Sequence, residues 1–77
     1  MPHFFFHVED GRAYMDPEGI ELHDADTAIH EAMRTAGEII REGDFIGEEW
    51  TMRVVDDHGK LIKALRFSGS GQLVRQH

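Results

Sequence analysis

The chain opens with an apolar segment that has the character of a β-strand. Residues 3–9 (HFFFHVE) are dominated by aromatic and β-branched side chains, which are enriched in strands. The dipeptide Asp10-Gly11 follows, and it is typical of a two-residue turn between antiparallel strands. A hairpin with that turn fixes the register of its two strands. The predicted cross-strand pairs are Glu9 with Arg12, Val8 with Ala13, His7 with Tyr14, and Phe6 with Met15.

A helical pattern occupies the middle of the chain. Apolar residues recur at steps of three and four over residues 25–42, which is the spacing of one face of an α-helix. Asp24 is the expected N-cap, and Gly43 is the expected C-terminal stop. Gly37 lies inside this helix at a cost of about 0.5–1 kcal/mol relative to Ala, which a close approach to a sheet could explain. The predicted apolar stripe is Ala25, Ala28, Ile29, Ala32, Met33, Ala36, Ile39 and Ile40.

Two more strands follow the helix. Residues 50–55 alternate between apolar and polar side chains, and residues 56–59 (DDHG) predict a turn into a last strand over residues 60–67. Both phases of the last strand mix apolar with charged residues. The phase that holds Leu61, Leu65 and Phe67 is the one that we expect to face the helix, with Lys63 near an edge where its ammonium reaches water.

The order of these elements predicts the fold class. Residues 16–19 (DPEG) predict a turn, and residues 20–22 predict a short extended piece before the helix. The order β-β-α-β-β predicts an α+β two-layer sandwich, in which an antiparallel sheet carries one helix on one face. Phe4 and Phe6 would face the helix and Phe5 the other side, so we expect the first strand to be central and beside the last one. The predicted domain covers residues 1–68, and residues 69–77 are a flexible tail.

Composition limits what such a chain can be. It has 77 residues, of which 40% are hydrophobic, and no Cys, so it holds one domain without disulfides or Cys-ligated zinc. A core this small contributes about 3–5 kcal/mol of stability, and oligomerisation is the simplest way to supplement it. The first residues lack the basic segment and the roughly 7–15 apolar residues of a signal peptide, so we expect a cytoplasmic protein.

Charge argues against nucleic-acid binding. Eight Lys and Arg face fifteen Asp and Glu, which gives a net charge of −7, whereas phosphate binding depends on Lys and Arg. Lys60, Lys63 and Arg66, with Arg53 opposite, form the one local concentration of cations. A solvated strand face explains this group better than a binding stripe does.

Three motifs along the chain match a pattern known from other small proteins. The opening MPHFFF fits M-P-x-[YF]-F-F, and residues 16–24 (DPEGIELHD) fit D-x-x-G-x-x-[LF]-x-[DS]. Residues 54–67 fit V-x-x-x-x-G-x-x-x-x-x-[VL]-x-F. Over residues 1–68 the chain therefore resembles a family of proteins of unknown function common in alpha-proteobacteria, although His7 stands where an acidic residue is expected. The resemblance implies a fold class but no activity, cofactor or catalytic residue.

Metal binding and catalysis are weakly supported. His3 and His7 would lie about 13 Å apart along a strand, and Asp26 with His30 offers two ligands of the four that a zinc site needs. Protonating all six histidines would move the net charge from −7 to −1, which favours self-association. Ser68 lies in a Gly/Ser stretch without a neighbouring base, and paired carboxylates occur at turns and caps. We therefore expect neither an enzyme nor a cofactor.

The sheet face away from the helix is the strongest functional candidate. Apolar residues on that face, rimmed by His7, Arg53 and Arg66, would form an interaction surface. Our leading hypothesis is a module that forms a homo-oligomer or binds an unidentified protein. One alternative is an antitoxin-like regulatory partner or a weakly nucleic-acid-associated protein, and another is a His-based binder of a metal or small ligand. The candidate surface residues are Phe5, His7, Tyr14, Arg53, Val55 and Ile62.

Overall fold

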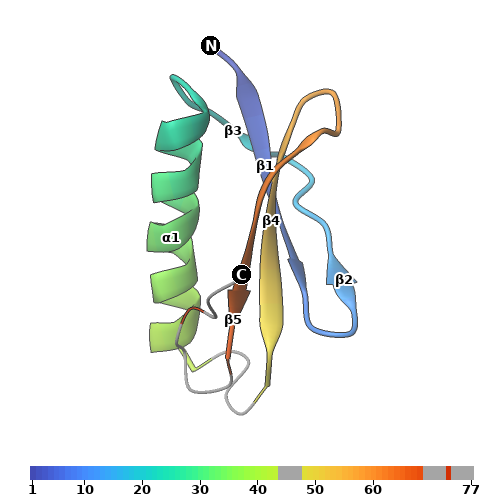
Figure 1. The fold of residues 1–77 in the computed structure, drawn as a ribbon, viewed down its shortest axis with the longest axis vertical. Coiled ribbons are helices and arrows are strands. Elements are labelled where there is room, and N and C mark those ends of the chain that lie inside the picture. Colours follow the sequence, from blue (N-terminus) through green and yellow to red (C-terminus); the bar gives the residue numbers. More distant parts are fainter. Residues whose placement is uncertain (44–47, 69–72, 74–77) are drawn as a thin grey trace.

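The computed structural model describes residues 1–43, 48–68 and 73, and in them one helix accompanies an antiparallel sheet of five strands (Figure 1). This is an α+β fold. No helix among these residues is long and apolar enough to cross a membrane. The elements are β1 (His3–Glu9), β2 (Ala13–Tyr14), β3 (Ile20–Glu21), α1 (Ala25–Arg41), β4 (Trp50–Asp56) and β5 (Leu61–Phe67).

The strand order places β1 inside the sheet, as predicted, but beside β4. The strand order is β2-β1-β4-β5. The short strand β3 pairs with the same edge of β1 as β2 does, but nearer the start of β1. The expectation that β1 lies beside the last strand was wrong. Because β5 carries the exposed cations Lys63 and Arg66, it suits an edge position, whereas β4 is apolar enough to be enclosed. Residues 20–22, expected only as an extended piece, supply the additional strand β3.

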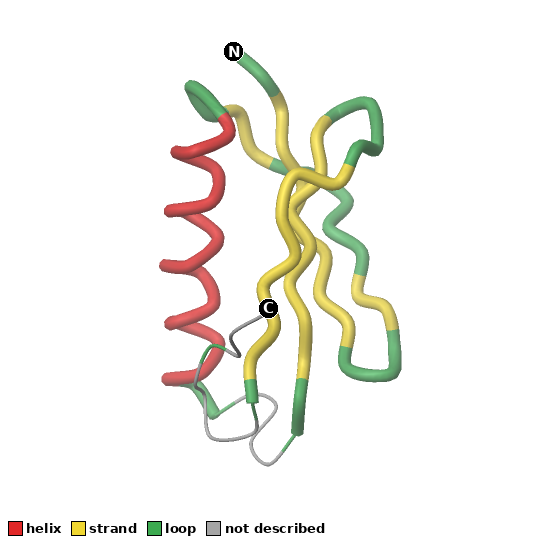
Figure 2. Tube along the Cα trace, in the orientation of Figure 1, coloured by secondary structure: helices red, strands yellow, loops and turns green. Residues whose placement is uncertain are grey.

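The helix begins and ends where the capping signals predict. The Asp24 carboxylate accepts the backbone N–H of Thr27 at 2.8 Å and its hydroxyl at 2.7 Å. At the other end, Gly43 adopts a positive φ of 84°, and its N–H donates to the carbonyl of Ile40 at 3.0 Å. The helix runs along one face of the sheet (Figure 2).

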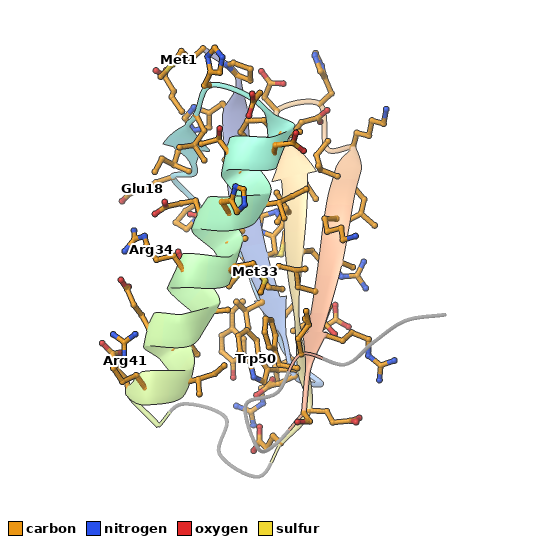
Figure 3. The ribbon with its side chains drawn as sticks, turned by 60° about the vertical axis from the view of Figure 1, so that its left-hand side comes forward. Met1, Glu18, Met33, Arg34, Arg41 and Trp50 are labelled. Carbon is orange, nitrogen blue, oxygen red and sulfur yellow. The ribbon has the colours of Figure 1, made fainter. Side chains whose placement is uncertain are left out.

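Small residues of α1 pack on large residues of the sheet. Ala28, Ala32 and Ala36, one helical turn apart, are fully buried. They let the helix approach closely, and the larger strand side chains fill the space between the layers. Figure 3 shows Trp50 in this layer, where its ring stacks on Phe67 at 4.6 Å. The buried strand residues are Phe4, Trp50, Met52, Val54, Leu65 and Phe67, and Phe6 and Val8 pack against them.

A β-bulge changes the phase of β5. Val54 pairs with Lys63, but the next residue, Val55, pairs with Leu61, so Ile62 is an extra residue on β5. The prediction for Leu65 and Phe67 is confirmed, because both are buried. The prediction for the start of the strand was wrong, because Leu61 is 48% exposed and Ile62 packs against the core. A strict period of two cannot show where an extra residue is inserted.

The first hairpin is shifted by one residue from the predicted register. Glu9 pairs with Ala13 and Val8 pairs with Tyr14, which leaves a loop of residues 10–12 in place of a two-residue turn. The Asp10 carboxylate closes this loop by accepting the N–H of Arg12 at 3.1 Å. A shift of one residue moves a side chain to the other face, so Tyr14 shares the helix face with Val8.

The C-terminal tail is described at one residue. Leu73 forms an isolated antiparallel bridge with Phe67. The rest of the predicted tail, residues 69–72 and 74–77, lies outside the described residues.

The surroundings of Gly37 correct the sequence interpretation and give a first prediction. A Cβ at Gly37 would meet no atom within 4 Å, so no close approach to the sheet requires glycine there. Gly37→Ala should raise the free energy of unfolding by about 0.5–1 kcal/mol, because it removes backbone entropy from the unfolded chain. Denaturant titration measures the change. In contrast, Ala32→Leu, on the buried face of the same helix, should lower stability by about 1–3 kcal/mol through overpacking. Equal effects of the two substitutions would contradict the assignment of the helix faces.

Candidate functional site

The face of the sheet away from α1, called the reverse face below, carries an ordered set of side chains. Paired residues of adjacent strands share a face, so the strand register arranges this face in rows across β1, β4 and β5. Within the described residues α1 is the only helix, and it packs on the opposite face. The first row is Phe5, Val55 and Leu61, the second is His7, Arg53 and Ala64, and the third is Glu9, Thr51 and Arg66.

The first row is apolar and becomes more open toward β5. Phe5 and Val55 are half-buried, whereas Leu61 is 48% exposed. Rings on β1 cover part of Phe5, because its centroid lies 5.1 Å from that of His3 and 6.1 Å from that of His7. The row therefore forms a narrow apolar strip that stays in contact with solvent.

The cations of the reverse face are matched by carboxylates. The Arg53 guanidinium lies 3.4 Å from Glu9, and the Arg66 guanidinium lies 3.7 Å from Glu49. Both pairs are exposed, so each contributes little to stability, but they neutralise the face. Lys63 pairs with Val54, whose side chain is buried under α1, so it belongs to the other face. The four cations singled out in the sequence therefore do not converge, which gives no support to a nucleic-acid interface.

The structure brings four of the six candidate surface residues together. These are Phe5, His7, Arg53 and Val55. Tyr14 and Ile62 do not belong to this group. The shift of the hairpin places Tyr14 on the helix face, and the bulge in β5 does the same for Ile62. Leu61 was missed for the same reason, since a bulge depends on how two strands pair and leaves no local sequence signal.

A turn at the edge of β1 is held by several side-chain hydrogen bonds. One oxygen of the Asp16 carboxylate accepts the N–H groups of Glu18 at 3.2 Å and Gly19 at 3.0 Å, and the other accepts that of Phe6 at 3.2 Å. The side chain thus takes the place of a strand partner between β2 and β3. Partial burial acts to raise the pKa of this carboxyl. Its backbone N–H donors, led by Gly19, and the nearby His7 nevertheless bring the pKa below its ordinary value of 3.8.

Two histidines of β1 hold the backbone of the 16–19 turn. The N–H of Asp16 donates to His7 Nδ1 at 3.0 Å, and His3 Nε2 lies 2.7 Å from the carbonyl oxygen of Glu18. Gly19 completes the turn with a φ of 67°, and a Cβ there would lie 2.6 Å from the carbonyl oxygen of Phe4. Sequence reasoning found the turn but missed these contacts, which join residues far apart in the chain and leave no local signal.

The other polar groups considered for chemistry lie at helix caps, in turns and at a strand end. Asp24 caps α1, and Asp56 accepts the N–H groups of His58 at 2.9 Å and Lys60 at 2.8 Å. In the part of the chain that the structure describes, no three His, Cys, Asp or Glu side chains gather as metal ligands, so Asp26 and His30 gain no third. Ser68 is half-buried at the end of β5, and the remaining Gly/Ser residues lie outside the described ranges.

Comparison with known proteins places the chain in a family. Residues 3–68 match the domain of unknown function DUF6894, and the chain belongs to that family. Searches of curated proteins and of solved structures gave no match. The matched segment covers every helix and strand described above.

The Asp16 carboxylate predicts how stability depends on pH. Because its folded pKa is lowered, its contribution is complete above the ordinary value of 3.8 and is lost as the pH falls through the folded pKa. Asp16→Asn should cost about 1–3 kcal/mol at neutral pH and should make the remaining stability less dependent on pH below about 4. Thermal unfolding at several pH values tests both effects. Asp57→Asn, an equal change of charge in an exposed turn, should leave the stability within about 0.5 kcal/mol of the parent at neutral pH.

The close contact at Gly19 gives a second prediction for this turn. Gly19→Ala should lower the free energy of unfolding by more than about 1–2 kcal/mol, since the strain of a positive φ adds to the clash with backbone. Gly59→Ala is the matched control, because Gly59 has a φ of 80° and no atom within 4 Å of the new Cβ. Equal losses in the two variants would show that the packing of the 16–19 turn on β1 contributes nothing.

Proposed function

We propose that this member of the DUF6894 family is a non-enzymatic interaction module, a helix layered on a sheet, that self-associates through the reverse face. The observation that carries the proposal is the apolar row of Phe5, Val55 and Leu61 on a face that α1 does not cover. An antiparallel sheet with one solvated face normally presents polar residues there. Three apolar side chains in one row across three strands are therefore unusual for a face that stays in water.

The sheet edges are poor routes for self-association. At one edge, β5 carries a bulge at Ile62 and the exposed Lys63, two features that hinder pairing with another strand. At the other edge, β2 and β3 have two residues each and are separated by the 16–19 turn. Pairing of edges would have to overcome both obstacles, so the open face is the better candidate.

A second copy of the chain suits this face. A two-fold axis along the apolar row would lay Phe5, Val55 and Leu61 on their counterparts. The axis would divide the face into two sides, one with the row of His7 and Arg53 and the other with His3 and its strand partner Glu21. In the dimer, the first side of each copy would lie over the second side of the other copy. This orientation keeps the two Arg53 side chains apart, whereas a two-fold axis along the strands would set each Arg53 on its counterpart.

The size of the face predicts a weak complex. Three strands of seven residues cover roughly 23 Å by 14 Å, or about 300 Å², which is less than the ~800 Å² per partner of a standard interface. Two copies also repel each other, because each carries a net charge of −7. Association should therefore require high protein concentration and strengthen as salt shortens the range of the repulsion.

Sedimentation equilibrium tests the proposal. The parent protein should associate at high micromolar concentration, more strongly with added salt, and Leu61→Asp should raise the dissociation constant at least about tenfold, because it places a charge in the apolar contact. Phe5→Asp should act in the same direction. Met33→Asp is the control of equal charge, since Met33 is 38% exposed and lies on α1, which packs on the other face of the sheet. A parent protein that stays monomeric at millimolar concentration and high salt would refute the proposal, and so would an equal effect of Met33→Asp.

A further inference from the structure

The two histidines that hold the 16–19 turn make hydrogen bonds of opposite sense. His7 Nδ1 accepts a bond from the N–H of Asp16, whereas His3 Nε2 lies against a carbonyl oxygen, to which it can only donate. We propose that His7 is a proton-sensitive latch, which holds the backbone N–H of Asp16 in the 16–19 turn only while its imidazole is neutral. The inference does not rest on the proposed self-association.

The chemistry of the imidazole ring carries this argument. To accept a bond at Nδ1, His7 must be neutral with its proton on Nε2. Uptake of a second proton converts Nδ1 into a donor, which then opposes the N–H of Asp16 at 3.0 Å. His3 donates from Nε2 in both its neutral and its charged form. One proton therefore breaks the contact of His7 and leaves that of His3 intact.

Charged groups around His7 determine what replaces the lost bond. Arg53 of β4 is the strand partner of His7. Its guanidinium forms an ion pair with Glu9, the next residue of β1 on this face. The carboxylate of Asp16 lies on the turn, close enough to His7 to interact electrostatically. A protonated imidazole is therefore drawn from the backbone of the turn toward its carboxylate, in competition with the N–H of Phe6.

The latch controls an edge of the sheet. Between β2 and β3, the turn supplies the only partner that the structure shows for the N–H of Phe6. Weakening the turn would expose this central part of β1, with His3 still attached at the far end. Acidification would thus loosen the 16–19 turn from the Asp16 end while α1, β4 and β5 stay in place.

Amide hydrogen exchange read by NMR tests the latch. In the parent protein, the protection factor of the Asp16 amide should fall about two- to tenfold between about pH 8 and about pH 5, the equivalent of one hydrogen bond. Amides in the centre of β4 should keep their protection. His7→Asn places an oxygen acceptor that cannot take up a proton near the position of Nδ1, and its Asp16 amide should lose the pH dependence. His3→Gln keeps a donor at the other end and should retain the parent's dependence.

Ring-nitrogen NMR shifts provide a measurement that needs no variant. At about pH 8 the unprotonated nitrogen of His7 should be Nδ1. A proton on Nδ1 at that pH would overturn the proposal, even where His7→Asn fails to fold. Equal protection of the Asp16 amide at both pH values in the parent would also overturn it, as would the same loss of protection in His7→Asn.

Discussion

The structure depends on one constraint, which is that a single helix can cover only one face of the sheet. The 17 residues of α1 span about 25 Å, close to the ~23 Å of a seven-residue strand, and a helix is about 10–12 Å wide. This is enough to shield the buried rows of β1, β4 and β5 on one side. Alanines on α1 bring the layers together, and the large strand residues supply most of the buried apolar volume. No helix of the described residues covers the other face, so its composition determines how the domain meets its surroundings.

Signals confined to a few neighbouring residues predicted well. The caps of α1, the buried side of β1 and the α+β class follow from local patterns at Asp24, Gly43 and the three Phe residues. Features that depend on how two strands meet were missed. The loop of residues 10–12 gained one residue because Asp10 closes it with its side chain, and the bulge at Ile62 gave β5 two phases. Each shift moved one expected surface residue, first Tyr14 and then Ile62, to the helix side.

The edge of β1 shows how a small domain can protect a strand without a full partner. A complete strand along this edge would present its own free edge to solvent. The strands β2 and β3 have two residues each, and the turn between them directs the Asp16 carboxylate to the N–H of Phe6. Together they provide hydrogen-bond partners for this edge of β1 without creating a long new edge. The arrangement places Gly19 where no side chain fits and brings two imidazoles against the turn. The DPEG motif is thus a structural device, and the histidines of β1 are part of it.

His7 links this edge to the open face. Its ring contacts Phe5 of the apolar row on one side, and its Nδ1 bonds to the turn on the other. Protonation of the ring changes both this hydrogen bond and the charge beside Arg53 on the reverse face. An added proton increases the positive charge of one row, which the proposed two-fold arrangement would set against the side that holds Glu21. In the proposed scheme the edge and the face are coupled through one side chain, whose bond to the turn is made within a single chain.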